Sequence, residues 1–351
     1  MDAMTIGVDL AKNVFEIVEN TGRSIPTSRR RLSRSQFEHF LAHHSPAHVV
    51  MEACGTSHHW ARVAQRYGHR VSLLPTQRVR PYVTHHRKTD YTDAAALLEA
   101  VRNPRIHPVP PKTVAQQELL TLHRLRTHWM TTRTARINML RGFLQEFGIP
   151  IARGARTACT TAAHVLADST VPVPARLRVV LPLLLVEIRE LETRIAAIEH
   201  ALAQVATDDV VVQRLHRIPG IGLLTATALV ATVGHIHAFR DGRHFASWIG
   251  LTPRERSSGQ RRRLGQISKA GDVYLRSLLT HGARSCLVAA RQATRRQRPV
   301  TRLQRWSLDV QQRCGHNKAA IAMANKLARI AWVVWAREVE FSADPPTRAA
   351  A

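Results

Sequence analysis

Residues 5–20, TIGVDLAKNVFEIVEN, predict two neighbouring strands joined by a tight turn at Lys12 and Asn13. Apolar side chains dominate both runs, which is typical of strands. Asp9 interrupts the first run, at a place where soluble proteins usually keep apolar residues. Because the chain has only 25 Asp+Glu against 51 Lys+Arg, an acid kept in such a place indicates that it holds a cation.

Strand-like and helix-like segments alternate outward from this pair, up to the proline-rich linker PVPPK at residues 108–112. The pattern predicts further strands at 48–53 and 69–75, and helices at 33–44, 57–68 and 89–103. A serine can cap the first of these helices, and a threonine or aspartate the last. We therefore expect a mixed α/β domain over residues 1–112.

Three more carboxylates stand out in this domain. Glu52 lies in the strand-like run HVVMEA, and Asp90 and Asp93 are spaced to share one face of a helix start. At an effective dielectric of about 20, two unit charges about 4 Å apart cost about 4 kcal/mol, so converging carboxylates favour bound divalent cations. Oxygen ligands suit Mg²⁺ or Mn²⁺, and a pair of such ions can stabilise both oxygens at a phosphodiester. The alternative is that Asp90 and Asp93 cap a helix while Asp9 and Glu52 pair with arginine.

The overall charge indicates a polyanionic partner. The 351 residues carry a net charge of +26, and nucleic acid is the leading candidate because neutralised phosphates release counterions. The four cysteines form no CxxC pair, which fits a reduced cytoplasmic protein. We expect no signal peptide, and the most apolar run, VVLPLLLVEI, is too short to span a bilayer.

Residues 113–208 predict a helical region. The helix that begins near Val114 should be roughly 50 Å long at 1.5 Å per residue. A heptad seam follows, with apolar residues at steps of four and three: Leu184, Ile188, Leu191, Ile195, Ile198, Leu202 and Val205. Such a seam packs either within the chain, as a helical hairpin, or between chains, as a coiled coil.

The segment 209–345 is rich in arginine and carries two motifs. The first is IPGIG at 218–222, which is similar to the turn of a helix-hairpin-helix element; backbone amides at Gly220 and Gly222 would face a phosphate. An ordinary turn between helices is the alternative. The second is SSG at 257–259, followed by three arginines. A serine there could be a nucleophile beside a phosphate. The alternative is that SSG forms a flexible turn and that the three arginines form a solvated basic patch.

Together these motifs resemble the DEDD transposases of the insertion-sequence 110 family, including its 1111 subgroup, to which LAKNVF leans. The matching stretches at the front are GVDLAKNVF, MEACGTSHHWA and KTDYTDAAALLEA. Those at the back are IPGIG, FASWIGLTPRERSSG and ISKAGDVYLRSLL. The resemblance covers nearly the whole chain, with the middle helices matching in pattern only.

The resemblance implies an α/β plus all-α fold: a RuvC-like (ribonuclease-H-like) domain over 1–112, a helical coiled-coil region over 113–208, and a mainly helical transposase domain over 209–345. It places the metal-binding acids at Asp9, Glu52, Asp90 and Asp93. It places the catalytic serine at Ser258, while Ser257 occupies a position at which the family varies. Arg261, Arg262, Arg263 and Lys269 are candidates for phosphate contacts.

The resemblance also implies partners and a reaction. Family members recombine double-stranded donor and target DNA, guided by a structured non-coding bridge or seeker RNA, and assemble as tetramers (dimers of dimers). Ser258 would form a 5′-phosphoserine in the bacterial cytoplasm, at the nucleoid. Two alternatives remain: a metal-dependent nuclease of the Holliday-junction type, in which water attacks, and a non-catalytic nucleic-acid-binding protein.

Overall fold

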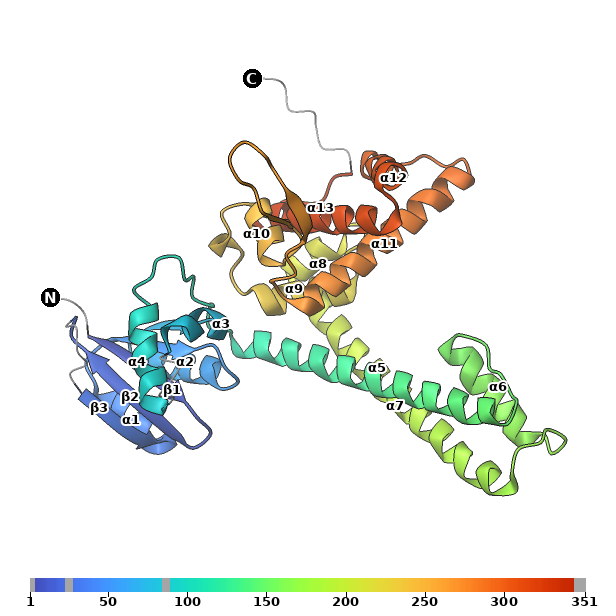
Figure 1. The fold of residues 1–351 in the computed structure, drawn as a ribbon, viewed down its shortest axis with the longest axis horizontal. Helices are drawn as coiled ribbons and strands as arrows, with labels where there is room; N and C mark the ends of the chain where they lie inside the picture. Colours follow the sequence, from blue (N-terminus) through green and yellow to red (C-terminus); the bar gives the residue numbers. More distant parts are fainter. Residues whose placement is uncertain (1–3, 23–27, 84–88, 344–351) are drawn as a thin grey trace. The chain divides into compact units, whose positions relative to one another are not determined.

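The computed structural model describes residues 4–22, 28–83 and 89–343. The chain divides into two compact units, Met1–Val114 and Ala115–Ala351, each of which is described by itself. The first unit is a mixed α/β structure and the second is mostly helical (Figure 1). The predicted end of the third segment at residue 345 lies outside the described residues.

The first unit is built on one five-stranded sheet. Its strands are β1 (Thr5–Leu10), β2 (Val14–Asn20), β3 (Ser28–Ser33), β4 (His48–Glu52) and β5 (Arg70–Leu74), in the order β3-β2-β1-β4-β5. β1 runs antiparallel to β2, as its hairpin requires, and parallel to β4. The predicted strand pair at 5–20 is confirmed. The edge strand β3, SRRRLS, was not predicted, because a run of arginines carries no apolar alternation.

Helices cover both faces of this sheet. They are α1 (Arg34–His43), α2 (Ser57–Arg66), α3 (Thr76–Val79), η1 (Arg80–Tyr82) and α4 (Asp90–Ala100). On the face of α1 and α2, the rings of Phe15, Phe37 and Trp60 meet with centroids 5.0–5.1 Å apart. On the other face, Ala94 and Leu98 of α4 pack against β2. The caps are Ser33 for α1 and Thr89 for α4, each within a capping box.

The second unit consists of helices and one short β-hairpin. The elements are α5 (Val114–Glu146), α6 (Ala155–Ala167), α7 (Ala175–Asp208), α8 (Val210–His216), α9 (Leu223–Val233), η2 (Ile236–Ala238), α10 (Gly242–Trp248), β6 (Pro253–Glu255), β7 (Leu264–Ile267), α11 (Val273–Arg295), α12 (Arg302–Cys314) and α13 (His316–Ala336). α5 begins at the predicted residue. α13 is long and apolar enough to cross a membrane, but many of its side chains, such as Met323 and Leu327, lie in the core of this unit.

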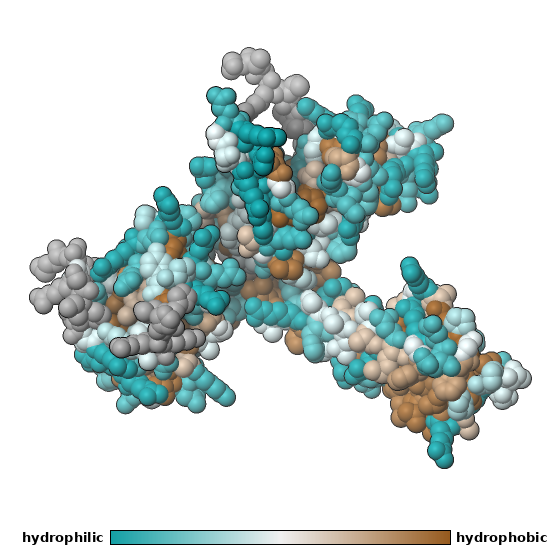
Figure 2. All heavy atoms as spheres, in the orientation of Figure 1, coloured by the Kyte–Doolittle hydropathy of each residue, from teal (hydrophilic) through white to brown (hydrophobic). Residues whose placement is uncertain are grey.

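The heptad seam of α7 packs within the chain against α5. Three ion pairs join the antiparallel helices: Arg126–Glu199, Arg133–Glu192 and Arg136–Glu187. The buried seam differs from the prediction at its start, because Leu181 and Leu185 are buried whereas Leu184 is only partly buried. The helical-hairpin alternative therefore describes the packing of this seam. Outside the seam, Val179, Val180 and Leu183 near the start of α7 are exposed. Figure 2 shows apolar side chains on the surface at this end of the α5–α7 pair.

A buried histidine fixes α5 to the body of the second unit. His123 is 2% exposed, and its ring nitrogens lie 3.0 Å from the hydroxyls of Tyr274 and Thr227. Burial, aided by the nearby Arg126, lowers the pKa of His123 to about 4. The ring is therefore neutral at physiological pH, which lets one nitrogen accept and the other donate a hydrogen bond.

Candidate active site

Four acids lie on the face of the sheet that α4 covers, and we name them the acid edge: Asp9, Glu52, Asp90 and Asp93. Val8 of β1 pairs with Met51 of β4, so the next residues, Asp9 and Glu52, end neighbouring strands and point to the same face. A Cβ at Gly7 would lie 2.4 Å from the Ala94 carbonyl oxygen, so α4 sits directly on β1. This close approach brings the first turn of α4 to the face that carries Asp9.

Three members of the acid edge have no cationic partner among the residues that the structure describes. Glu52, Asp90 and Asp93 form no ion pair with any residue that the structure describes. Asp9, Glu52 and Asp93 are half-buried and Asp90 is exposed. The three carboxylates are therefore not offset by a direct ion pair with a described side chain, although the chain has twice as many basic as acidic residues.

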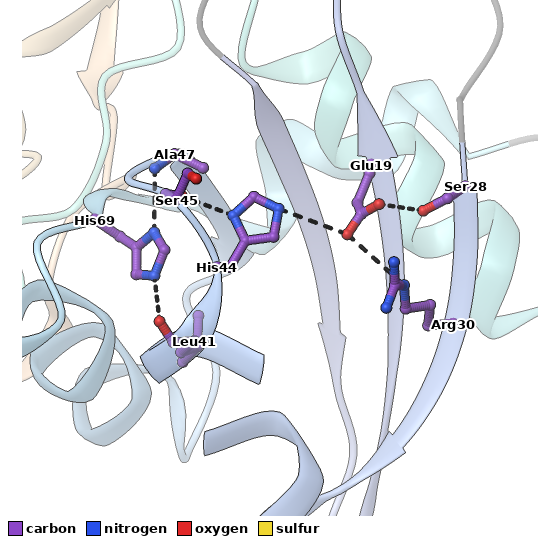
Figure 3. A network of polar contacts seen from close by, with 8 residues as sticks. All are labelled: Glu19, Ser28, Arg30, Leu41, His44, Ser45, Ala47 and His69. Carbon is purple, nitrogen blue, oxygen red and sulfur yellow. Dashed lines mark hydrogen bonds and ion pairs between the residues drawn. The ribbon is translucent and has the colours of Figure 1, made fainter. Parts of the chain in front are cut away.

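Two buried glutamates of β2 show the contrasting arrangement. Glu19 contacts Ser28 and lies 3.9 Å from Arg30 and 3.8 Å from His44 (Figure 3). Glu16 is paired directly across from Asp9 in the sheet and forms an ion pair with Arg29 of β3. Glu16 is thus a carboxylate beside the acid edge that arginine neutralises. Sequence reasoning missed it, although its place in the strand VFEIVEN was a signal of the same kind as that of Asp9.

The acid edge supplies donors that fit a hard divalent cation. Its members offer only carboxylate oxygens, from β1, β4 and α4, and three of them form no ion pair with a described residue. Within residues 4–22, 28–83 and 89–343, no three His, Cys, Asp or Glu side chains are gathered closely enough to hold a metal. The four acids therefore share a face without forming a closed ligand cage. The alternative that Asp90 and Asp93 only cap α4 is not needed, since Thr89 is the cap.

The candidate serine lies on the β6–β7 hairpin, residues 253–267, which we name the serine hairpin. The register shifts between Pro253 and Glu255, and from there Glu255 pairs with Leu264 and Ser258 with Arg261, so one register holds from Glu255 to a two-residue turn. Gly259 opens this turn with φ 56°, a conformation that glycine adopts at little cost. Because side chains alternate along a strand, the register assigns the two serines to opposite faces.

The first face of the serine hairpin holds a closed set of contacts around Glu255. The Ser257 hydroxyl donates a hydrogen bond of 2.7 Å to Glu255, and Arg262 lies 3.2 Å from the same carboxylate oxygen. Ser257 also accepts a hydrogen bond from the backbone amide of Arg263. The hydrogen bond from Ser257, followed by the charge of Arg262, lowers the pKa of Glu255. Ser257 therefore has a structural partner on each side.

The opposite face, which we name the arginine face, carries Ser258. The same register and alternation group it with Arg256, Arg261 and Arg263. Arg254 lies at the register shift, but it lines one pocket together with Arg256 and Arg263, so we count it with this face. Ser258 is exposed, and its hydroxyl has no hydrogen-bond partner in the part of the chain that the structure describes. The three arginines predicted together thus divide, with Arg261 and Arg263 on the side of Ser258. Sequence reasoning missed Arg254 and Arg256, which the alternation R-x-R-x-S would have revealed.

The IPGIG turn joins α8 to α9, and its two glycines differ. Gly220 has φ 89°, and a Cβ on it would lie 2.6 Å from the Cys286 sulfur of α11. A Cβ on Gly282 would lie 1.8 Å from the Gly220 carbonyl oxygen, so the turn and α11 meet backbone to backbone. Gly222 is exposed at the start of α9, with nothing within 4 Å of its Cβ position. Gly220 therefore has a packing role, and only Gly222 has open space for a phosphate.

Two protein-family models match separate parts of the chain. Residues 6–149 match the DEDD transposase family of insertion sequence IS110, described as "Transposase", and residues 212–298 match the "Transposase IS116/IS110/IS902 family". A "Probable family 20 transposase" of Pseudomonas aeruginosa is 40% identical, over 96% of this chain and 98% of that one.

Two relatives are named after their insertion sequences. "Transposase for insertion sequence element IS1111A" of Coxiella burnetii is 38% identical, over 96% of this chain and 91% of its own. "Transposase for insertion sequence element IS1328" of Yersinia enterocolitica is 38% identical, over 96% and 98%. These matches cover both the acid edge and the serine hairpin, and the chain accordingly belongs to the DEDD transposases of the IS110 family, enzymes that act on DNA and whose acids imply a divalent metal ion.

Proposed function

We propose that this transposase cuts and rejoins double-stranded DNA through a covalent bond between Ser258 and a 5′-phosphate. The observation that carries the proposal is the division of the serine hairpin. Ser257 is engaged by Glu255 and by a backbone amide, whereas the Ser258 hydroxyl is exposed and shares its face with arginines. A nucleophile must be accessible to its phosphate, and cations beside it stabilise the charge that develops on phosphorus.

The proposed step conserves the number of phosphoester bonds. The Ser258 oxygen forms a bond to phosphorus and loses its proton to solvent. The bond between phosphorus and the 3′-oxygen of the neighbouring nucleotide breaks, and this oxygen takes up a proton to become a free 3′-hydroxyl. In the reverse direction a 3′-hydroxyl from another strand attacks the phosphoserine. Strand joining therefore needs no external energy source, since each bond is replaced by one of the same kind.

Asp9, Glu52, Asp90 and Asp93 would hold the divalent ion, Mg²⁺ or Mn²⁺. When bound, the ion supplies Lewis acidity toward the phosphate oxygens. The residues themselves contribute fixed positions: Asp9 and Glu52 at adjacent strand ends, and the other two on the first turn of α4. A second function of the acids is to keep negative charge on this face of a very basic protein.

The two adjacent serines provide a matched test of the nucleophile. Ser258→Ala should lower strand cleavage by about a thousandfold or more, because it removes the attacking atom. Ser257→Ala, its neighbour with equal exposure, should retain the covalent protein–DNA adduct on a denaturing gel with labelled DNA. Full cleavage by Ser258→Ala would establish the alternative of water attack. Loss of the adduct only in Ser257→Ala would show that Ser257, and not Ser258, is the nucleophile.

We further propose that a structured non-coding guide RNA directs this enzyme to donor and target DNA, and that it acts as a tetramer, a dimer of dimers, in the bacterial cytoplasm at the nucleoid. The net charge of +26 supports a large nucleic-acid surface. The 38% identity to the IS1111A transposase supports the 1111 subgroup. Sequencing RNA that co-purifies with the protein tests the guide, since the proposal requires a transcript from DNA flanking the gene.

The finer division of the fold is also a proposal. The five-stranded sheet with helices on both faces supports a RuvC-like domain over 1–112. The paired helices α5 and α7 support a coiled-coil region over 113–208, and α8, the glycine turn and α9 support a helix-hairpin-helix-like element at the start of a transposase domain over 209–345. Expressing 209–345 alone tests whether this last region folds as a separate domain.

A further inference from the structure

A basic pocket of about 480 Å³ opens beside the arginine face of the serine hairpin, a size within the roughly 300–1,000 Å³ range of ligand sites. Four cations line it, Arg254, Arg256, Arg263 and Lys269, and its lining contains no acid. The acid of the hairpin, Glu255, lies on the opposite face with Arg262. The acid of the hairpin therefore lies on one face, and the charged side chains that line the pocket on the other face are all cationic.

Lys269 is held in this pocket in a conformation that lysine avoids. Its φ is 54°, in the left-handed region, which costs a non-glycine residue of order 1–2 kcal/mol. Among the described residues, only Gln297 and Glu338 share a positive φ without being glycine. Such strain persists where surrounding structure enforces it, and it occurs often at sites that bind a ligand.

The contacts around Lys269 explain how the strain is enforced. Its amide donates to the Gly250 carbonyl at 3.2 Å, and a Cβ on Gly271 would lie 1.9 Å from the Trp248 carbonyl oxygen. Arg276 donates to the carbonyls of Ile249 and Gly271 at 3.0 and 3.2 Å. The segment is thus pressed against the end of α10, and the lysine cannot relax its backbone without breaking these contacts.

The guanidinium of Arg254 is fixed as well, because it donates to the Ser268 carbonyl at 3.0 Å. We propose that the basic pocket binds a phosphate of the DNA backbone next to the scissile one, and that Lys269, Arg254 and Arg256 form the clamp. The pocket and Ser258 share the arginine face, so a strand held there passes the proposed nucleophile. This proposal rests on the proposed function for the position of the scissile phosphate, but its binding step stands on the pocket alone.

Lys269→Gly is the decisive variant, because glycine accepts φ 54° while the whole side chain with its ammonium is lost. Unfolding in urea should occur at an equal or higher concentration than for the wild type, since the strain is relieved. The affinity for a short DNA duplex should fall several-fold at low salt. The slope of log affinity against log salt should decrease by about one, the value for one lost phosphate contact. Lys269→Arg should retain the slope because it keeps the charge.

Arg262→Ala is the matched control, since it removes one cation from the same hairpin on the face of Glu255. It should leave the slope unchanged. An unchanged slope in Lys269→Gly, or an equal decrease of the slope in Arg262→Ala, would contradict the proposal that the pocket binds a phosphate. High DNA concentration should restore cleavage to Lys269→Gly but not to Ser258→Ala. If Ser258→Ala keeps full cleavage while Lys269→Gly still lowers the salt slope, the serine mechanism is wrong and the phosphate-binding pocket is retained. If Ser258→Ala abolishes cleavage while Lys269→Gly leaves the slope unchanged, only the pocket is wrong.

Discussion

The acid edge and the serine hairpin are supported in opposite ways. Behind the acid edge, Val8, Met51 and Ala94 are fully buried, so the elements that carry the carboxylates are fixed by a packed core. The serine hairpin is exposed along both strands and is held by polar contacts of its own side chains. Carboxylates that share a cation need fixed backbone positions. The proposed nucleophile Ser258 needs access to a duplex instead, and the exposed hairpin provides it.

The largest effect is expected from replacing the glycine on which the acid edge depends. In Gly7→Val, the Cβ would lie 2.4 Å from the Ala94 carbonyl oxygen, so α4 must move away from β1. Overpacking of this kind typically costs about 1–3 kcal/mol, and Mn²⁺ affinity, measured by calorimetry, should fall with it. The control is Gly142→Ala in α5, which meets nothing within 4 Å and should unfold no earlier than the wild type. If Gly7→Val is as stable as the wild type, the acid edge does not depend on a tightly packed core, and the contrast with the serine hairpin is wrong.

An effect on stability alone is expected at the ion pair beside the acid edge. Arg29→Ala leaves Glu16, which is 4% exposed, without its partner and removes the cation that lies 4.9 Å from the centre of the Tyr91 ring. An unpaired buried acceptor costs about 1–3 kcal/mol, which urea unfolding would report. The double variant with Glu16→Gln should recover part of this loss because no charge remains buried. If the double variant is no more stable than Arg29→Ala, the pair does not act in this way.

The smallest effect on stability is expected from the serine hairpin. Glu255→Gln loses the ion pair with Arg262, yet global unfolding should stay unchanged because no core is involved. Amide exchange within 253–267 should become faster at neutral pH. Since folding lowers the pKa of Glu255, the anchor exists at neutral pH and is lost as the pH falls below the usual glutamate range, so wild type and variant should converge there. A change in global unfolding would contradict the proposed local role.

The sequence predicted elements whose chemistry is local. Alternating apolar runs located β1, β2, β4 and β5, and capping residues located α1 and α4, because each signal lies within a few residues. Strand β3 was not predicted, because its arginine-rich sequence is held in the sheet by pairing with β2 rather than by burial. Leu184 was assigned to the seam because its spacing fits, whereas the packing of α7 on α5 and α6 selects Leu181 and Leu185.

The candidate site was predictable in kind but not in arrangement. The four acids stand out in the sequence because they interrupt apolar runs in a basic chain. The different contacts of Ser257 and Ser258 depend on the register of the hairpin, and two consecutive serines in the sequence do not specify this register. The packing of Gly220 against Gly282 was likewise not predicted, since the two residues are far apart in the chain. The resemblance, rather than spacing, had already favoured Ser258.

The α5–α7 pair has a further consequence when its length is expressed in base pairs. α5 has 33 residues and is therefore about 50 Å long, which equals the rise of roughly fifteen base pairs of a duplex. Its three interhelical ion pairs lock the two helices in one register, so this length is fixed. Adding one heptad to each helix would extend the pair by about 10 Å, or about three base pairs. The helical pair thus spans a distance comparable with the length of a short DNA duplex.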